Sequence, residues 1–175
     1  VSVSDSGPGD NSIMYTLPTL MDGIAVSASY NPSISGTTPG NEAEIGLSAT
    51  YTGVEGLSLS YGVTDLNRAG TATDGDQTAW KASYAYNSVT VAVANSEYDV
   101  TGTASDQEVS SYKISYTVSD AISIGYGSET ISTSTAGELD AEYDGFNASY
   151  TAGGMTISAA MQDGAEIAHS TAVAE

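Results

Sequence analysis

The side chains of this chain that could do chemistry are few, and most of them carry fixed charges rather than reactive groups. Lys81 and Lys113 are the two lysines that fall within alternating, strand-like segments, and each stands three residues before a tyrosine. We therefore expect both at similar heights on the same face of a sheet. Ammonium groups facing carboxylates across water would create a transverse field that sorts ions. The alternative, equally open, is that they only neutralise nearby carboxylates such as Glu44 or Glu129.

Acidic side chains in the polar connections are the other charged candidates. Hard cations such as Ca²⁺ and Mg²⁺ prefer carboxylate oxygens. The stretch DGDQ, which begins at Asp74, lacks the full pattern of a calcium-binding loop, so a solvated acidic loop is the simpler interpretation. We keep a loop site for Ca²⁺ or Mg²⁺ as a hypothesis, and it is the only cofactor that the sequence suggests. Its candidate ligands are Asp74, Asp76, Asp99 and Asp106.

Signals of catalysis are weak. His169 is the only histidine and lies in a polar C-terminal stretch, and the chain has no cysteine. A Ser-His-acid triad, a histidine metal centre and thiolate chemistry therefore have little support. No nucleophile elbow, phosphate loop or dinucleotide fingerprint is present. We predict that the protein is not an enzyme.

The charge balance limits the partners and the fold. Three Lys plus Arg stand against 22 Asp plus Glu, for a net charge of -19, so binding to nucleic acid is not expected. Regularly patterned apolar residues, 40% of the chain, favour a folded protein over a disordered one. No run of eighteen apolar residues exists, which argues against a transmembrane helix. Strands of a membrane barrel need only about 9–11 residues of alternating polarity.

Strands must position these groups, because apolar and small polar residues alternate along the chain. Tight turns and longer polar connections also alternate, and Tyr51, Tyr84, Tyr116 and Tyr150 recur at intervals of 33, 32 and 34 residues. One repeat is therefore one hairpin plus one long connection, which predicts an all-β, antiparallel, up-and-down sheet forming a single domain over residues 1–175. Residues 163–175 are predicted as a polar loop or tail. The ten predicted strands are 12–17, 23–30, 42–51, 56–63, 78–86, 89–96, 108–118, 121–129, 139–150 and 155–162.

The two faces of these strands differ in a way that suggests a bilayer. One face is large and apolar and ends in aromatic residues, as in the girdles of a transmembrane β-barrel. The predicted girdle is Tyr30, Tyr51, Tyr61, Trp80, Tyr86, Tyr112, Tyr116, Tyr126 and Tyr150. The opposite face is mostly Ser, Thr, Ala and Gly, and would line a water-filled lumen; its candidate pore-lining residues are Met14, Glu44, Lys81, Lys113, Glu129 and Gln162. A bulge at Gly145 is expected to keep Asp144 off the lipid face. Half-buried strands of a soluble protein are the alternative.

One segment adds a resemblance to these patterns. The stretch NSIMYTLPTLMDGIAVSASYNP resembles the general porins of Gram-negative bacteria, and later hairpins such as YTVSDAISIGYG look like porin strands. The matching positions of the first stretch are Asn11, Ser12, Ile13, Tyr15, Pro18, Gly23, Ser29 and Tyr30. The resemblance implies a barrel of sixteen strands, of which this chain would supply about ten, from near the sixth to near the fifteenth. The family often carries a basic residue at the position of Met14, so that charge would be missing here.

The function expected from these observations is an outer-membrane porin that passes small hydrophilic solutes and ions by passive diffusion. The overall acidity favours cations over anions. The resemblance further implies a homotrimer in contact with outer-membrane lipid and lipopolysaccharide, and surface loops could serve as a receptor for phage or another binder. The alternative from a different class is a secreted acidic β-repeat surface protein, adhesin-like or surface-layer-like, with cation-binding loops.

Overall fold

The computed structural model describes residues 13–18, 21–32, 43–66, 75–100 and 106–166. Within these ranges the regular structure consists of ten strands, so the prediction of an all-β chain is confirmed. No helix among the described residues is long and apolar enough to cross a membrane. The strands are β1 (Ile13–Thr16), β2 (Ile24–Asn31), β3 (Glu44–Tyr51), β4 (Leu57–Leu66), β5 (Gly75–Tyr86), β6 (Val89–Val100), β7 (Gln107–Ser119), β8 (Ile122–Thr133), β9 (Ala141–Ala152) and β10 (Met155–Ala165).

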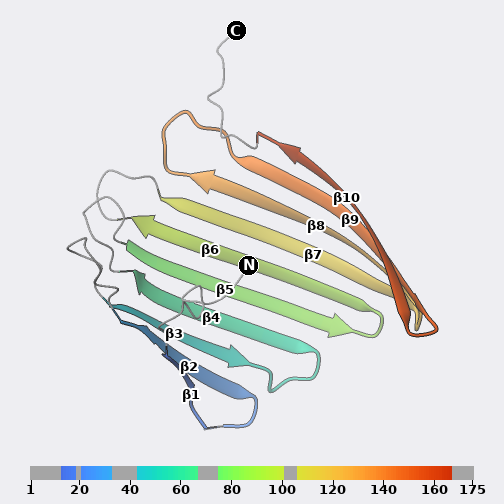
Figure 1. The fold of residues 1–175 in the computed structure, drawn as a ribbon, viewed down its shortest axis with the longest axis horizontal. Coiled ribbons are helices and arrows are strands. Elements are labelled where there is room, and N and C mark those ends of the chain that lie inside the picture. Colours follow the sequence, from blue (N-terminus) through green and yellow to red (C-terminus); the bar gives the residue numbers. More distant parts are fainter. Residues whose placement is uncertain (1–12, 19–20, 33–42, 67–74, 101–105, 167–175) are drawn as a thin grey trace.

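The ten strands form one antiparallel sheet in which every strand pairs with its neighbours in sequence, from β1 to β10 (Figure 1). The predicted up-and-down topology is therefore confirmed. Tight turns such as Asn87–Ser88, Asp120–Ala121 and Gly153–Gly154 lie together at one end of the sheet, and the longer connections lie at the other (Figure 1). The sheet curls across its width without closing, so β1 and β10 are its two edges.

Most strands run further than predicted at the end with the long connections. β4 continues to Leu66, β6 to Val100 and β8 to Thr133, three or four residues past the predicted ends at 63, 96 and 129. The prediction stopped where apolar alternation stops, whereas backbone hydrogen bonding continues through polar residues. β10 likewise reaches Ala165, so residues 163–165 extend a strand rather than belonging to the predicted loop or tail. Residues 167–175 lie outside the described part of the chain.

The bulge predicted at Gly145 is absent. β8 and β9 pair without interruption from Ile122 opposite Tyr150 to Ile131 opposite Ala141. The prediction was wrong because Asp144 and Phe146 are two residues apart and therefore share a face of a regular strand. The register shift lies instead between Thr117 and Ser119 on β7.

The sheet has no packed core of its own. Among the described residues the buried hydrophobic side chains are Ala79, Ala94, Val100 and Ala141, and none of the larger side chains is fully buried. Large apolar side chains are exposed instead, including Phe146 at 66% and Met161 at 79%. Backbone pairing between strands thus holds the described sheet together, and its apolar face requires a further apolar environment.

Candidate functional site

The cross-strand register assigns every strand residue to one of two faces, because residues directly opposite each other share a face. We call the face with Lys113 the polar face. Lys113 lies opposite Ala92 and Gly127, and Lys81 lies opposite Ser60 and Ala94. Small neighbours of this kind leave the two ammonium groups unobstructed. All six residues predicted to line a pore lie on the polar face: Met14, Glu44, Lys81, Lys113, Glu129 and Gln162.

The other face, which we call the apolar face, carries all nine predicted girdle residues: Tyr30, Tyr51, Tyr61, Trp80, Tyr86, Tyr112, Tyr116, Tyr126 and Tyr150. Tyr15, Tyr84 and Phe146 belong to the same face, in addition to the nine residues predicted for the girdle. The ring centroids of Tyr126 and Phe146 lie 4.7 Å apart. The large apolar side chains of this face form a belt, which we call the apolar belt, and aromatic residues stand at both of its ends.

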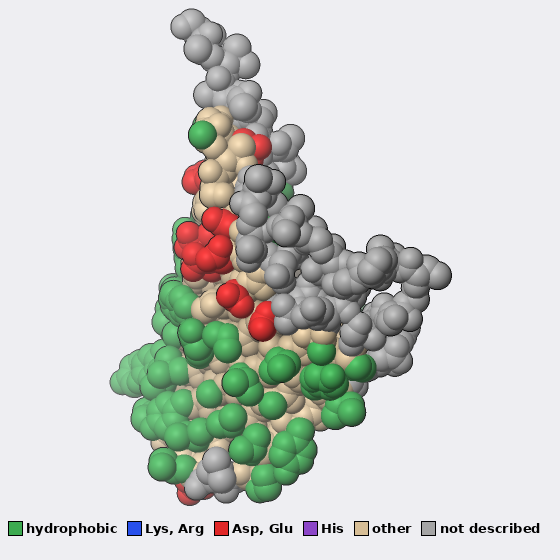
Figure 2. All heavy atoms as spheres, turned by 90° about the vertical axis from the view of Figure 1, so that its left-hand side faces the viewer, with side chains coloured by type: hydrophobic (Ala, Val, Ile, Leu, Met, Phe, Trp, Pro, Cys, Tyr) green, Lys and Arg blue, Asp and Glu red, His purple; other side chains and the backbone are tan. Residues whose placement is uncertain are grey.

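Rows of carboxylates lie beyond this belt, still on the apolar face and towards the long connections. Asp76 is directly opposite both Asp65 and Asp99, and Glu97 is directly opposite Glu108. Figure 2 shows a broad hydrophobic area with Asp and Glu side chains gathered at its border, and no Lys or Arg on the face in view. Like charges in such positions repel one another and are screened by salt. We call these residues the acidic rows.

At the height of the acidic rows the polar face is mixed, with Gln77, Tyr98 and Gln107 in one cross-strand row and apolar side chains beside them. Val100 follows Asp99, and Ala141 precedes Glu142; Val100 is 8% exposed and Ala141 is 1% exposed. Ile131 lies directly opposite both Val109 and Ala141 on this face. Near the long connections the polar face therefore gains apolar side chains, while the apolar face gains carboxylates. The sequence interpretation missed this change because it treated each face as uniform along the whole strand.

The residues predicted to hold Ca²⁺ or Mg²⁺ are only partly brought together. Asp76 and Asp99 are cross-strand neighbours. Asp106 accepts a hydrogen bond from the backbone N–H of Val100 at 2.9 Å, while Asp74 lies outside the described residues. Across the described ranges, no three Asp, Glu, His or Cys side chains are arranged to hold a metal ion. The loop metal site stays a prediction.

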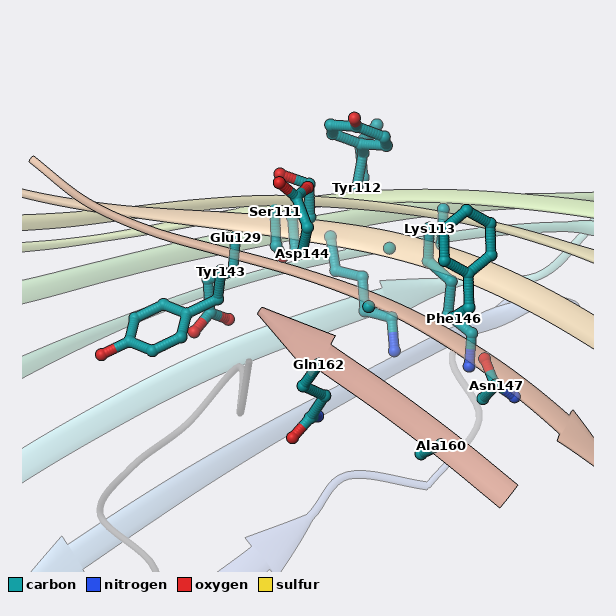
Figure 3. Close-up of a pocket in the computed structure, with 17 residues that line it drawn as sticks. Ser111, Tyr112, Lys113, Glu129, Tyr143, Asp144, Phe146, Asn147, Ala160 and Gln162 are labelled. Carbon is teal, nitrogen blue, oxygen red and sulfur yellow. The ribbon is translucent and has the colours of Figure 1, made fainter. Parts of the chain in front are cut away.

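A hollow on the polar face brings four of the predicted pore-lining residues together. It spans β5 to β10, has a volume of about 520 Å³, and is lined by Lys81, Lys113, Glu129 and Gln162 among others. In Figure 3, Glu129, Tyr143, Asn147 and Gln162 extend to one side of the sheet, whereas Tyr112 extends to the opposite side. Met14 and Glu44 do not line this hollow. The sequence pattern placed the charged groups on one face but did not indicate which of them share a hollow.

The comparisons with known proteins decide the family. The chain matches the family model described as Gram-negative porin over residues 2–163. It belongs to the Gram-negative porin family. A solved porin structure refined at 1.8 Å resolution is similar, with a TM-score of 0.69 and 21% sequence identity over 86% of this chain and 55% of that chain. This chain thus spans about half the length of that porin. No curated protein matches it.

Membership in this family confirms the resemblance noted in the sequence and places the protein in the bacterial outer membrane. Porins are channel proteins rather than enzymes, in agreement with the prediction. The match also favours a porin over the secreted surface protein that the sequence left open. Outer-membrane barrels carry an apolar band with aromatic girdles outside and polar residues inside. The two faces of this sheet agree with that arrangement.

Proposed function

We propose that the protein containing this chain forms a water-filled channel through which small hydrophilic solutes and ions diffuse passively. The observation that carries the proposal is the contrast between the faces of one sheet. The apolar face exposes Leu47 at 53% and Ile114 at 46%, far more apolar surface than a water-soluble sheet tolerates. The polar face carries side chains too small to fill a core, which suits a wall in contact with water.

In this proposal the six polar-face residues line the pore: Met14, Glu44, Lys81, Lys113, Glu129 and Gln162. Their support is the register that places them on one face. Two carboxylates and two ammonium groups among them balance, so the described wall has no strong charge preference of its own. The cation preference that we propose arises from the net charge of -19 and from the acidic rows, which attract cations towards the mouth.

Reversal potentials across planar bilayers test the channel and its selectivity together. We expect the full-length protein to conduct and to prefer potassium over chloride, and the preference to weaken at high salt because surface charges are screened. Replacing Asp65, Asp76 and Asp99 together by Asn should reduce the preference more than replacing Glu129 alone by Gln. A preference for chloride would contradict the proposed selectivity, and absence of conductance would contradict the channel.

The same proposal includes a homotrimer in contact with outer-membrane lipid and lipopolysaccharide. The acidic rows adjoin the apolar belt, at the height where lipid headgroups begin, and divalent cations could link them to headgroup phosphates. Surface loops as a receptor for phage or another binder also belong to it. Light scattering of the detergent-solubilised full-length protein tests the trimer, and a monomeric mass would contradict it.

A further inference from the structure

Two glycines leave a gap in the wall formed by the polar face. Gly127 on β8 and Gly145 on β9 lie directly opposite each other, between Lys113 on β7 and Gln162 on β10. A Cβ atom on Gly127 would lie 3.2 Å from the backbone oxygen of Tyr112. The missing side chains create the middle of the hollow of about 520 Å³ described above.

Side chains of contrasting chemistry surround this gap. One row towards the long connections, Glu129 lies opposite Tyr143. One row towards the tight turns, Asn147 lies opposite Gly125. With Lys113 and Gln162, the rim of the hollow therefore presents an ammonium group, a carboxylate, a phenol and two amides (Figure 3).

These rim groups make no hydrogen bond or ion pair with other described residues, unlike polar side chains elsewhere on the same face. Ser123 and Ser149 hydroxyls lie 2.7 Å apart, and the hydroxyls of Thr151 and Thr156 lie 2.9 Å apart. Lys113 and Glu129 are diagonal neighbours across β7 and β8, a spacing of about 7–8 Å between backbones. Long side chains can meet across this spacing, but Lys113 and Glu129 form no ion pair in the described structure, so a molecule can lie between them.

We propose that the hollow is a binding site for small zwitterionic solutes of the amino-acid class, which rests on the proposed channel function. Lys113 binds the solute carboxylate and Glu129 binds its ammonium group, while Asn147, Gln162 and Tyr143 supply further hydrogen bonds. A simple anion would leave Glu129 without a partner, and a simple cation would be repelled by Lys113 and the nearby Lys81. A neutral polyol would leave both charged groups without a partner.

Ion current through the full-length protein in planar bilayers tests this site. L-serine should reduce the current in a saturable way, while glycerol, of similar size and without charge, should not. Lys113→Gln and Glu129→Gln should each weaken the apparent affinity for serine roughly fivefold, as expected for one partly exposed charge pair. Gly127→Ala, which adds a methyl group inside the hollow and keeps every charge, should also weaken it.

Glu55→Gln is the matched control, because it makes the same charge change in the tight turn between β3 and β4, outside the hollow and outside the proposed pore lining. Its serine affinity should equal that of the unmodified protein. Equal effects of serine and glycerol, or equal losses in Glu55→Gln and Glu129→Gln, would overturn the site while the channel stands. Lactate has the carboxylate without the ammonium group, and binding as tight as that of serine would refute the role of Glu129. Loss of all conductance in every form would instead contradict the channel itself.

Discussion

Replacement of Ile114 by lysine tests the assignment of the two faces most directly. Ile114 lies near the middle of β7 on the apolar face, between Tyr112 and Tyr116 along the strand. Its cross-strand neighbours are Val91 and Tyr126, and 46% of its surface is exposed. If this face meets lipid, a lysine here would place a charge in the hydrocarbon region.

The expected cost follows from depth in the bilayer. A lysine on the lipid face near the midplane costs about 2–4 kcal/mol, and the cost falls to about 0–1 kcal/mol near the interface. At about 1.4 kcal/mol per factor of ten, Ile114→Lys should lower the folding equilibrium constant roughly 30- to 700-fold. Ser115→Lys places the same charge on the polar face beside Gly125, where water solvates it, and should change stability by less than about 1 kcal/mol. Ser110→Lys, on the apolar face beyond Tyr112, should also cost little.

The assay is urea unfolding of the full-length protein refolded into lipid vesicles, with the folded fraction read from heat-dependent mobility on a gel. Equal costs for Ile114→Lys and Ser115→Lys would refute the assignment of the faces. A cost for Ser110→Lys as large as that for Ile114→Lys would refute a different step, namely that the apolar face passes from lipid into water near Tyr112. The two outcomes can be told apart because the first compares Ile114→Lys with Ser115→Lys, on the opposite face of β7, and the second compares it with Ser110→Lys, on the same face of β7.

Two further predictions concern stability and use the same unfolding assay. Asp76→Asn should stabilise the protein by about 0.5 kcal/mol at low salt and by less at high salt, because Asp76 faces a carboxylate on each neighbouring strand. The control is Asp120→Asn, in a tight turn. An equal gain in stability there would contradict repulsion within the acidic rows as the cause. Gly56→Ala should cost about 2 kcal/mol or more, since its φ is +76° and the new methyl group would collide with the backbone oxygen of Ala85. Gly137→Ala, with a φ of +86° and nothing within 4 Å, should cost only about 1 kcal/mol, and equal costs would exclude the collision as a cause.

Alternation along the sequence was sufficient to predict the ten strands and both faces. Trp80 and Lys81 are adjacent, and a pleated strand must send them to opposite sides, as the register confirms. Strand ends could not be predicted in the same way, because β6 continues to Val100 through residues whose alternation no longer follows that of Val89, Val91 and Val93. The backbone ladder needs only amide groups, which every residue except proline provides.

Features that depend on register were beyond the sequence pattern. Asp65, Asp76 and Asp99 belong to three different strands, and only the pairing of those strands shows that they form one row. Gly127 and Gly145 likewise become neighbours only through the register of β8 with β9. A shift of one residue would move either set to another face or partner. The candidate residues were therefore predictable one by one, whereas the hollow that several of them share was not.

The change in side-chain polarity along strands such as β6 follows from their length. β6 has 12 residues, which extend about 40 Å along the strand. At a tilt of about 40° such a strand rises roughly 30 Å, more than the apolar band of about 25 Å in outer-membrane barrels. Its end at Asp99 and Val100 must therefore project beyond the lipid. There the outer face meets water, which favours Asp99, and the opposite face can bury Val100 as in a water-soluble protein. The acidic rows thus mark the border of the bilayer on the side of the long connections, because only above that border does a carboxylate on the apolar face cost little.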